Sequence, residues 1–182
     1  LLYRTLAEIQ GAACDIIDYN EDWSLGDEFS KSNDWIKIAF LANPNSPSGT
    51  ILPPERVAEL ASKLPCSLLV DEAYVDFSET NCVDLVATNE KIMVARTLSK
   101  SYALAGLRFG YLIAQPRIIR ELNKLKDSYN CDALSIAGAT AALDDQAWLK
   151  ETRAAILATR ERLSAALREL GFDVVDSQAN FV

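Results

Sequence analysis

The sequence predicts an α/β fold, in which a mostly parallel sheet carries helices on both faces. Four short apolar segments of strand length alternate with helical segments in the first two thirds of the chain. Such alternation is typical of βα units, which build parallel sheets covered by helices. The last third of the chain has long segments of helical periodicity, and these predict further helices.

The N-terminal segment is predicted to form one helix and one strand. Apolar residues recur at helical spacing from residue 2 to residue 9, and Gly11 ends the pattern. Residues 14–18 then favour a short strand.

Four buried strands are expected next, because four apolar runs are bounded by turn residues. They occupy residues 35–43, 67–74, 91–97 and 107–114. The turn-rich sequence NPNSPSGT ends the first strand, and a pair of prolines at 53–54 opens a helix after it. Asn43, Asp71 and Lys100 lie at or just beyond the carboxyl ends of three different strands. Ligands of parallel sheets bind at this rim, so the sequence predicts a site there.

Beyond residue 115 the chain is predicted to be helical. Two helices occupy residues 118–125 and 132–143, and a longer one carries an apolar stripe that Gly171 ends. The sequence FDVV then begins a strand. These features predict part of a large α/β domain in 1–144, a long connecting helix in 145–171 and the start of a small α+β domain in 172–182.

Composition excludes several classes of protein. The 18 basic and 26 acidic residues give a formal net charge of −8, which repels nucleic acid and anionic membrane surfaces. No apolar run approaches the roughly 20 residues that span a bilayer, and four scattered cysteines favour reduced thiols. We therefore expect a cytoplasmic protein.

The absence of histidine excludes Ser-His-Asp catalysis and most catalytic zinc sites within this segment, and we expect no metal site.

Three motifs carry the chemistry, although each is weak alone. The composition of NPNSPSGT is that of any turn, and a single lysine is most often a solvated surface residue. In order, however, the chain has NPNSPSGT, VDEAY and RTLSKSYALAGLRFGY. This order of motifs resembles that of the fold-type I pyridoxal-phosphate aminotransferases. The residues within the motifs are most similar to those of the histidinol-phosphate aminotransferases. The resemblance covers nearly the whole chain, as far as SQANFV at its end.

The resemblance implies a role for each matched residue. Lys100 would hold pyridoxal 5'-phosphate as a Schiff base and then move the substrate proton. Asp71 would keep the pyridine nitrogen protonated, so that the ring accepts electrons. Tyr74 and Asn43 would donate hydrogen bonds to the ring oxygen O3′.

The cofactor phosphate requires charge and short donors beside the lysine. The family pattern assigns this task to Arg108, Ser99 and Thr97, because a guanidinium and two hydroxyls suit a phosphate. Glu72 has a different expected role, as the partner of a backbone group or an arginine.

The resemblance implies transamination between glutamate and an imidazole-acetol phosphate acceptor, or the reverse, in histidine biosynthesis. The partners are then small amino-acid and keto substrates, and a second copy in a homodimer. A phosphothreonine decarboxylase and an aromatic aminotransferase of the same fold remain alternatives, as does a non-catalytic scaffold. A scaffold has no need for five such residues together, and a nicotinamide dehydrogenase lacks its G-x-G-x-x-G motif.

Two functional parts of the family are not found in these residues. The glycine-rich phosphate loop with the aromatic residue that stacks on the ring is expected before residue 1, and the arginine that binds the substrate carboxylate after residue 182. We therefore expect the 182-residue chain to be inactive by itself.

Overall fold

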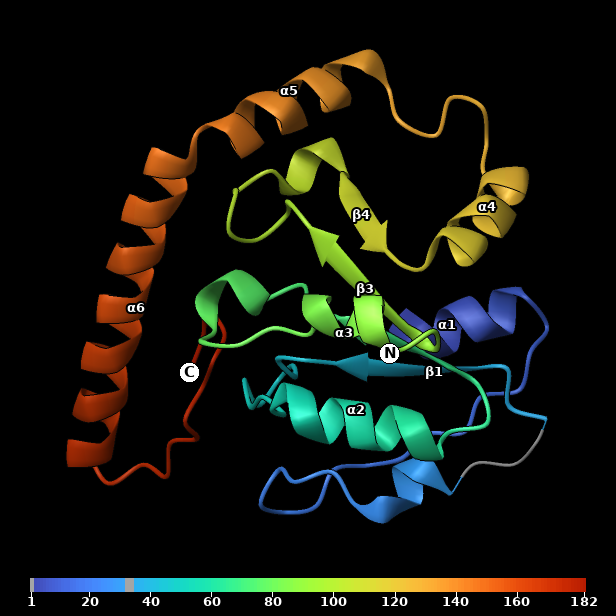
Figure 1. Ribbon diagram of the computed structural model, residues 1–182. Helices are drawn as coiled ribbons and strands as arrows, with labels where there is room; N and C mark the ends of the chain where they lie inside the picture. The colour runs from blue at the N-terminus through green and yellow to red at the C-terminus, as the bar shows by residue number, and fades with distance from the viewer. Residues whose placement is uncertain (1, 32–34) are drawn as a thin grey trace.

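The computed structural model describes residues 2–31 and 35–182, and a four-stranded sheet lies at its centre (Figure 1). The strands stand in the order β1-β2-β3-β4, and their bounds are Ile38–Ala42, Ser67–Asp71, Ile92–Thr97 and Gly110–Ile113. β1, β2 and β3 are parallel, whereas β4 is antiparallel to β3. The predicted mostly parallel α/β sheet is therefore confirmed.

The connection that precedes β4 contains no α-helix. Residues 98–109 contain only a 3-10 turn, η3 (Ala105–Leu107). Parallel neighbours are joined by a crossover, usually an α-helix, whereas antiparallel neighbours can be joined by a loop that reverses the chain. The loop that contains η3 reverses the chain and returns it beside β3 in the opposite direction.

Six α-helices and two further 3-10 turns surround this sheet in the described residues. The α-helices are α1 (Leu2–Ile9), α2 (Pro54–Lys63), α3 (Val83–Thr88), α4 (Pro116–Leu125), α5 (Ala133–Asp144) and α6 (Gln146–Glu169), and the turns are η1 (Asp27–Ser30) and η2 (Val75–Phe77). The predicted helices are confirmed. The six-residue α3 was not predicted, because so short a segment shows too little periodicity.

The main core lies between one face of the sheet and α2 with α3. Alternate residues of the strands point to this face, as the two-residue period of a strand requires. The buried members are Leu41, Leu68, Val70, Ile92 and Val94 from the strands, Val57, Leu60 and Ala61 from α2, and Val86 from α3. On the other face, Tyr3 of α1 stacks on Phe40 of β1 with ring centres 5.0 Å apart. Helices therefore lie on both faces.

Two predicted strands are wrong. Residues 14–18 and 172–175 are both irregular in the structure. A strand exists only through hydrogen bonds to a neighbouring strand, and neither segment pairs with another in the described chain. The division into 1–144, 145–171 and 172–182 stays a prediction, although α6 spans nearly the whole middle part.

The C-terminal residues turn back onto the sheet rim. Ser177 and Ala179 are buried, and the Gln178 backbone N–H donates to the Gly49 carbonyl at 2.7 Å. Figure 1 shows this last segment returning from the far end of α6 toward the middle of the molecule. No helix in residues 2–31 and 35–182 is long and apolar enough to span a membrane.

Candidate active site

The carboxyl ends of the three parallel strands bring the predicted residues to one rim. Asn43 directly follows β1, Asp71 is the last residue of β2, and Lys100 lies three residues beyond β3. The Asn43 backbone N–H donates to the Asp71 carbonyl at 2.9 Å, and Asp71 stands in register with Ala95 of β3. The parallel strands therefore bring these three residues to the same rim of the sheet.

The Asp71 carboxylate is held by one donor on each oxygen. Oδ1 accepts the Ala73 backbone N–H at 3.0 Å, and Oδ2 accepts the Tyr3 hydroxyl at 2.7 Å. A carboxylate has about four acceptor positions. Asp71 is only half-buried, so the carboxylate can accept a further donor from the rim.

Lys100 and Tyr74 lie in contact. The Lys100 Nζ atom stands 4.9 Å from the centre of the Tyr74 ring, a distance at which an ammonium is attracted to the ring face. A second aromatic residue, Phe181, packs against Tyr74 with the two rings nearly perpendicular and their centres 5.2 Å apart. Phe181 was not predicted to belong to the site, because the sequence gives no sign that a residue so distant along the chain returns to it.

Of the residues predicted to bind phosphate, two have hydroxyls that are paired with each other, and the third is an exposed arginine. The Thr97 hydroxyl donates to the Ser99 hydroxyl at 2.9 Å, and the Ser99 backbone N–H donates back to Thr97 Oγ1 at 3.1 Å. Arg108 is exposed in the left-handed conformation, with φ of 51°, and it donates to the Ala105 carbonyl at 2.8 Å. The structure thus brings the two hydroxyls together and keeps the guanidinium on the turn beside them.

The Asn43 side chain is bonded to protein groups at the end of β1. Its Nδ2 donates to the Leu52 carbonyl at 3.0 Å and points at Cys82 Sγ at 3.8 Å, while its Oδ1 accepts the Leu52 backbone N–H at 2.7 Å. Only 2% of the residue is exposed. The Asn43 amide therefore stabilises the 43–52 turn through its two hydrogen bonds to Leu52. A contact between Asn43 and the ring oxygen O3′ of the cofactor stays a prediction.

Glu72 has the structural role that the sequence predicted. Its side chain is fully buried; Oε1 accepts the Cys82 backbone N–H at 2.5 Å, and Oε2 accepts two N–H groups of Arg96 at 2.7 and 2.9 Å. Burial raises the pKa of Glu72, although these donors oppose the shift. Burial, with the nearby Glu72 carboxylate, also raises the pKa of the Cys82 thiol to about 12, so Cys82 stays protonated.

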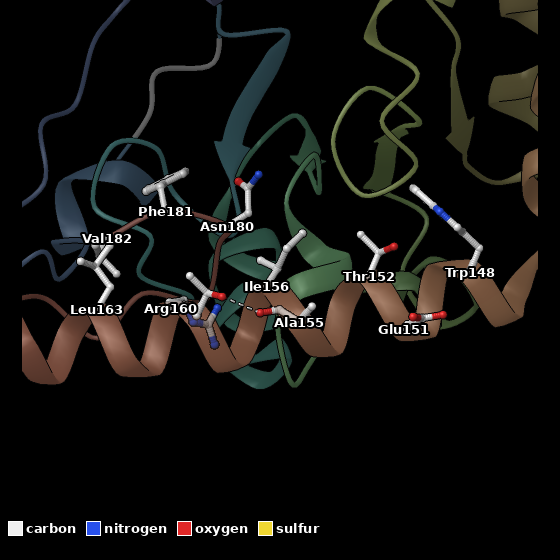
Figure 2. A pocket seen from close by; sticks show the side chains of 11 residues that line it. Trp148, Glu151, Thr152, Ala155, Ile156, Arg160, Leu163, Asn180, Phe181 and Val182 are labelled. Atoms are coloured by element: carbon white, nitrogen blue, oxygen red, sulfur yellow. Dashed lines mark hydrogen bonds between the residues drawn. The ribbon is translucent and has the colours of Figure 1, made fainter.

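A cavity of about 500 Å³ adjoins the site along α6. Figure 2 shows Trp148, Ile156 and Leu163 of α6 together with Asn180, Phe181 and Val182 of the C-terminal segment around it. Arg160 of α6 donates to the Ala179 carbonyl at 2.7 Å and so holds this segment to the helix. Phe181 lines the cavity and also touches Tyr74, and it connects the cavity to the rim.

The chemistry available at the rim is that of an amine beside a phenol and a carboxylate. A lysine amine can bond covalently to a carbonyl carbon and can carry a proton to or from a neighbouring carbon. Within the part of the chain that the structure describes, no group of three or more acidic or cysteine residues is arranged to hold a metal ion.

Comparison with known proteins gives one family. The model of the family described as aminotransferase class I and II matches residues 6–182. Histidinol-phosphate aminotransferase of Rhodopirellula baltica is 56% identical over this whole chain and 50% of its own length. Histidinol-phosphate aminotransferase 1 of a Nostoc species is 45% identical over the whole chain and 51% of its own length.

The solved structures have the same fold. Histidinol-phosphate aminotransferase from Sinorhizobium meliloti, solved in complex with pyridoxal 5'-phosphate, matches 97% of this chain and 50% of its own with a TM-score of 0.86 and 28% identity. The chain thus spans about half the length of the curated relatives it matches.

Proposed function

Because this chain belongs to the class I and II aminotransferase family, we propose that the full-length protein is a pyridoxal-phosphate-dependent aminotransferase with Lys100 as its catalytic lysine. One observation carries the proposal. The Lys100 amine lies 4.9 Å from the centre of the Tyr74 ring, on the rim where Asp71 also ends its strand. An amine, a phenol and a carboxylate in one place are the groups that this cofactor chemistry needs.

The side chains of the rim fit the cofactor group by group. Lys100 offers the amine for the cofactor aldehyde, and Asp71 offers a half-buried carboxylate for the pyridine nitrogen. Tyr74 offers a donor for the ring oxygen. Thr97 and Ser99, whose hydroxyls are already paired, would bind the phosphate together with Arg108. Asn43 would contribute by holding the turn, since its amide is bonded to Leu52.

Each residue then has a defined task in the reaction. When bound, the cofactor accepts the electrons of the substrate Cα–H bond. Lys100 Nζ would take the proton from the substrate Cα and deliver it to the cofactor carbon C4′. The negative charge of Asp71 would keep a proton on the pyridine nitrogen, so that the ring can accept electrons.

The substrate proposal is more specific. The relatives from Rhodopirellula baltica and Nostoc are histidinol-phosphate aminotransferases at 56% and 45% identity. We therefore propose that the full-length protein exchanges an amino group between glutamate or 2-oxoglutarate and histidinol phosphate or its ketone, as a cytoplasmic homodimer. The cavity beside Phe181 adjoins the rim, and its mixed apolar and polar lining suits a side chain that carries a ring.

A substrate panel with full-length protein tests this proposal. Histidinol phosphate, O-phosphothreonine and phenylalanine are each supplied with 2-oxoglutarate, and glutamate and carbon dioxide are both measured. We expect glutamate from histidinol phosphate with a kcat/KM at least tenfold above that of phenylalanine. Carbon dioxide released from O-phosphothreonine would show a decarboxylase instead, and a protein that binds no cofactor and turns over none of the three would be a scaffold.

A further inference from the structure

A tyrosine from the first helix reaches the central carboxylate of the candidate site. The Tyr3 hydroxyl donates to Asp71 Oδ2 at 2.7 Å, although the two residues are 68 positions apart. The other oxygen of Asp71 accepts the Ala73 backbone N–H from its own turn. Tyr3 is thus the long-range side-chain partner of this carboxylate, and nothing in the motifs points to it.

The ring of Tyr3 is held in place independently of this bond. It stacks on Phe40 of β1 with ring centres 5.0 Å apart and planes inclined by 17°. Phe40 is in register with Leu69 of β2, two residues before Asp71, so the same strand pair carries both the platform and the acceptor. The stacked ring therefore fixes the direction from which the hydroxyl approaches Asp71.

The hydroxyl remains a neutral donor. Burial raises the pKa of Tyr3 well above its ordinary value, and the hydrogen bond and charge of Asp71 raise it further. Tyr3 therefore stays protonated, donates the hydrogen bond and adds no net charge beside Asp71. A hydrogen bond to one oxygen of a carboxylate restricts the rotation of that group.

We propose that Tyr3 is a positioning residue for Asp71, whose carboxylate it holds oriented toward the pyridine nitrogen of the bound cofactor. This inference rests on the proposed function. With Tyr3 and Ala73 each using one acceptor position, the carboxylate keeps further positions for the ring nitrogen. Tyr3 acts through Asp71 and touches no reacting atom.

The test removes the hydroxyl and keeps the ring. In full-length protein, Tyr3→Phe should retain the stacking on Phe40 and weaken cofactor binding roughly 5- to 10-fold, as expected when a charged acceptor loses one hydrogen bond. The dissociation constant is measured by titrating apoprotein with pyridoxal phosphate and following its absorbance. At saturating cofactor, kcat should fall while the KM of the amino donor stays unchanged.

Tyr19→Phe is the matched control, because Tyr19 is also half-buried and lies near Tyr3. The dissociation constant of pyridoxal phosphate from the Tyr19→Phe variant should equal that from the unmodified protein.

A double-mutant cycle separates positioning from a merely structural role. If Tyr3 acts through Asp71, then Tyr3→Phe should not weaken cofactor binding further in an Asp71→Ala background. An equal loss in both backgrounds, or an unchanged dissociation constant in Tyr3→Phe alone, would overturn the inference. If the unmodified protein bound no pyridoxal phosphate, the proposed function itself would fail, and the two failures are thereby distinguished.

Discussion

Two neighbouring carboxylates at the end of β2 have opposite surroundings. Asp71 is half-buried and faces the rim with Tyr3 and Ala73 as donors. Glu72 is fully buried and bonded to Arg96 and to the backbone of Cys82. Successive side chains of a strand point to opposite faces, so one carboxylate serves the site and the other serves the core. Substitutions at these two positions should therefore separate activity from stability.

Asp71→Asn should reduce activity and leave the fold intact. The amide has nearly the same shape, but it cannot keep a proton on a pyridine nitrogen by its charge. Since this interaction matters most when electrons move into the ring, kcat should fall roughly 100-fold or more. Borohydride-reducible binding at saturating cofactor should persist. Unchanged turnover in Asp71→Asn would show that Asp71 is not the partner of the ring nitrogen.

Glu72→Gln should instead reduce stability. The neutral amide loses the ion pair with Arg96 and directs an N–H group at a donor, either Arg96 or the Cys82 backbone. We expect a loss of about 2 kcal/mol in the free energy of unfolding, measured in urea. Glu79→Gln, at an exposed position of the next turn, is the control and should change the stability by less than about 0.5 kcal/mol. Equal stabilities for the two variants would contradict a structural role for Glu72.

The residues of the site could be predicted only where the sequence carries a motif. Lys100, Asp71 and Tyr74 stand in short ordered motifs, and the rim that unites the first two follows from parallel strands. Tyr3 and Phe181 contact the same site from the two ends of the chain. Their positions depend on how α1 and the C-terminal segment pack, and local sequence patterns do not specify such packing.

At the level of elements, the turn after β1 and the C-terminal segment form one packed unit. Gly49 has a φ of +73°, and a side chain at this position would place its Cβ 2.6 Å from Ser177 Cβ. The Gly49 carbonyl also accepts the Gln178 backbone N–H at 2.7 Å. Glycine is required here both for its backbone conformation and for the close approach of the second segment.

Gly49→Ala should therefore destabilise the protein more than an alanine placed at a similar φ in open space. Gly171 provides this control, because its φ is +87° and no described atom lies within 4 Å of the position that a Cβ would occupy. We expect Gly171→Ala to cost about 1 kcal/mol for conformation alone. Gly49→Ala should cost at least about 1 kcal/mol more, because Ser177 must move. Thermal unfolding of the full-length variants measures both, and equal losses would contradict the packing described here.

Strand positions were predictable and strand partners were not. The apolar runs located all four strands, and the turn-rich NPNSPSGT ended the first where the structure ends it. The antiparallel direction of β4 depends on the length and shape of the loop before it. The segments 14–18 and 172–175 have strand-like composition but no neighbouring strand among the described residues. Composition alone cannot reveal whether an edge is available for pairing.

On the scale of the whole molecule, large apolar side chains remain exposed. Some lie on α1, and many lie on the helices of the last third and on the segments that join them, where Leu125, Tyr129 and Leu134 are 82%, 90% and 81% exposed. The chain also spans about half the length of its curated relatives. Surfaces of this kind are usually covered by other parts of a protein or by a partner subunit.

The 182-residue chain alone should associate and should have no transaminase activity. Association would bury the exposed apolar side chains of α4, α5 and their connecting loop. We expect catalysis to need residues beyond these 182, because the chain spans about half the length of its curated relatives. Light scattering measures the mass in solution, and an assay with saturating cofactor measures turnover. A clean monomer with appreciable turnover would show that the site is more self-contained than proposed.

The most direct measurement locates the cofactor on the polypeptide. Full-length protein is loaded with pyridoxal phosphate, reduced with borohydride and digested, and the modified peptide is identified by mass spectrometry, with Lys100→Arg treated in parallel. We predict that the visible absorbance is lost on reduction, that the cofactor mass is attached to Lys100, and that Lys100→Arg carries none. Attachment to another lysine, such as Lys91, whose amine donates to the Leu64 carbonyl at 2.6 Å, would contradict the assignment of Lys100.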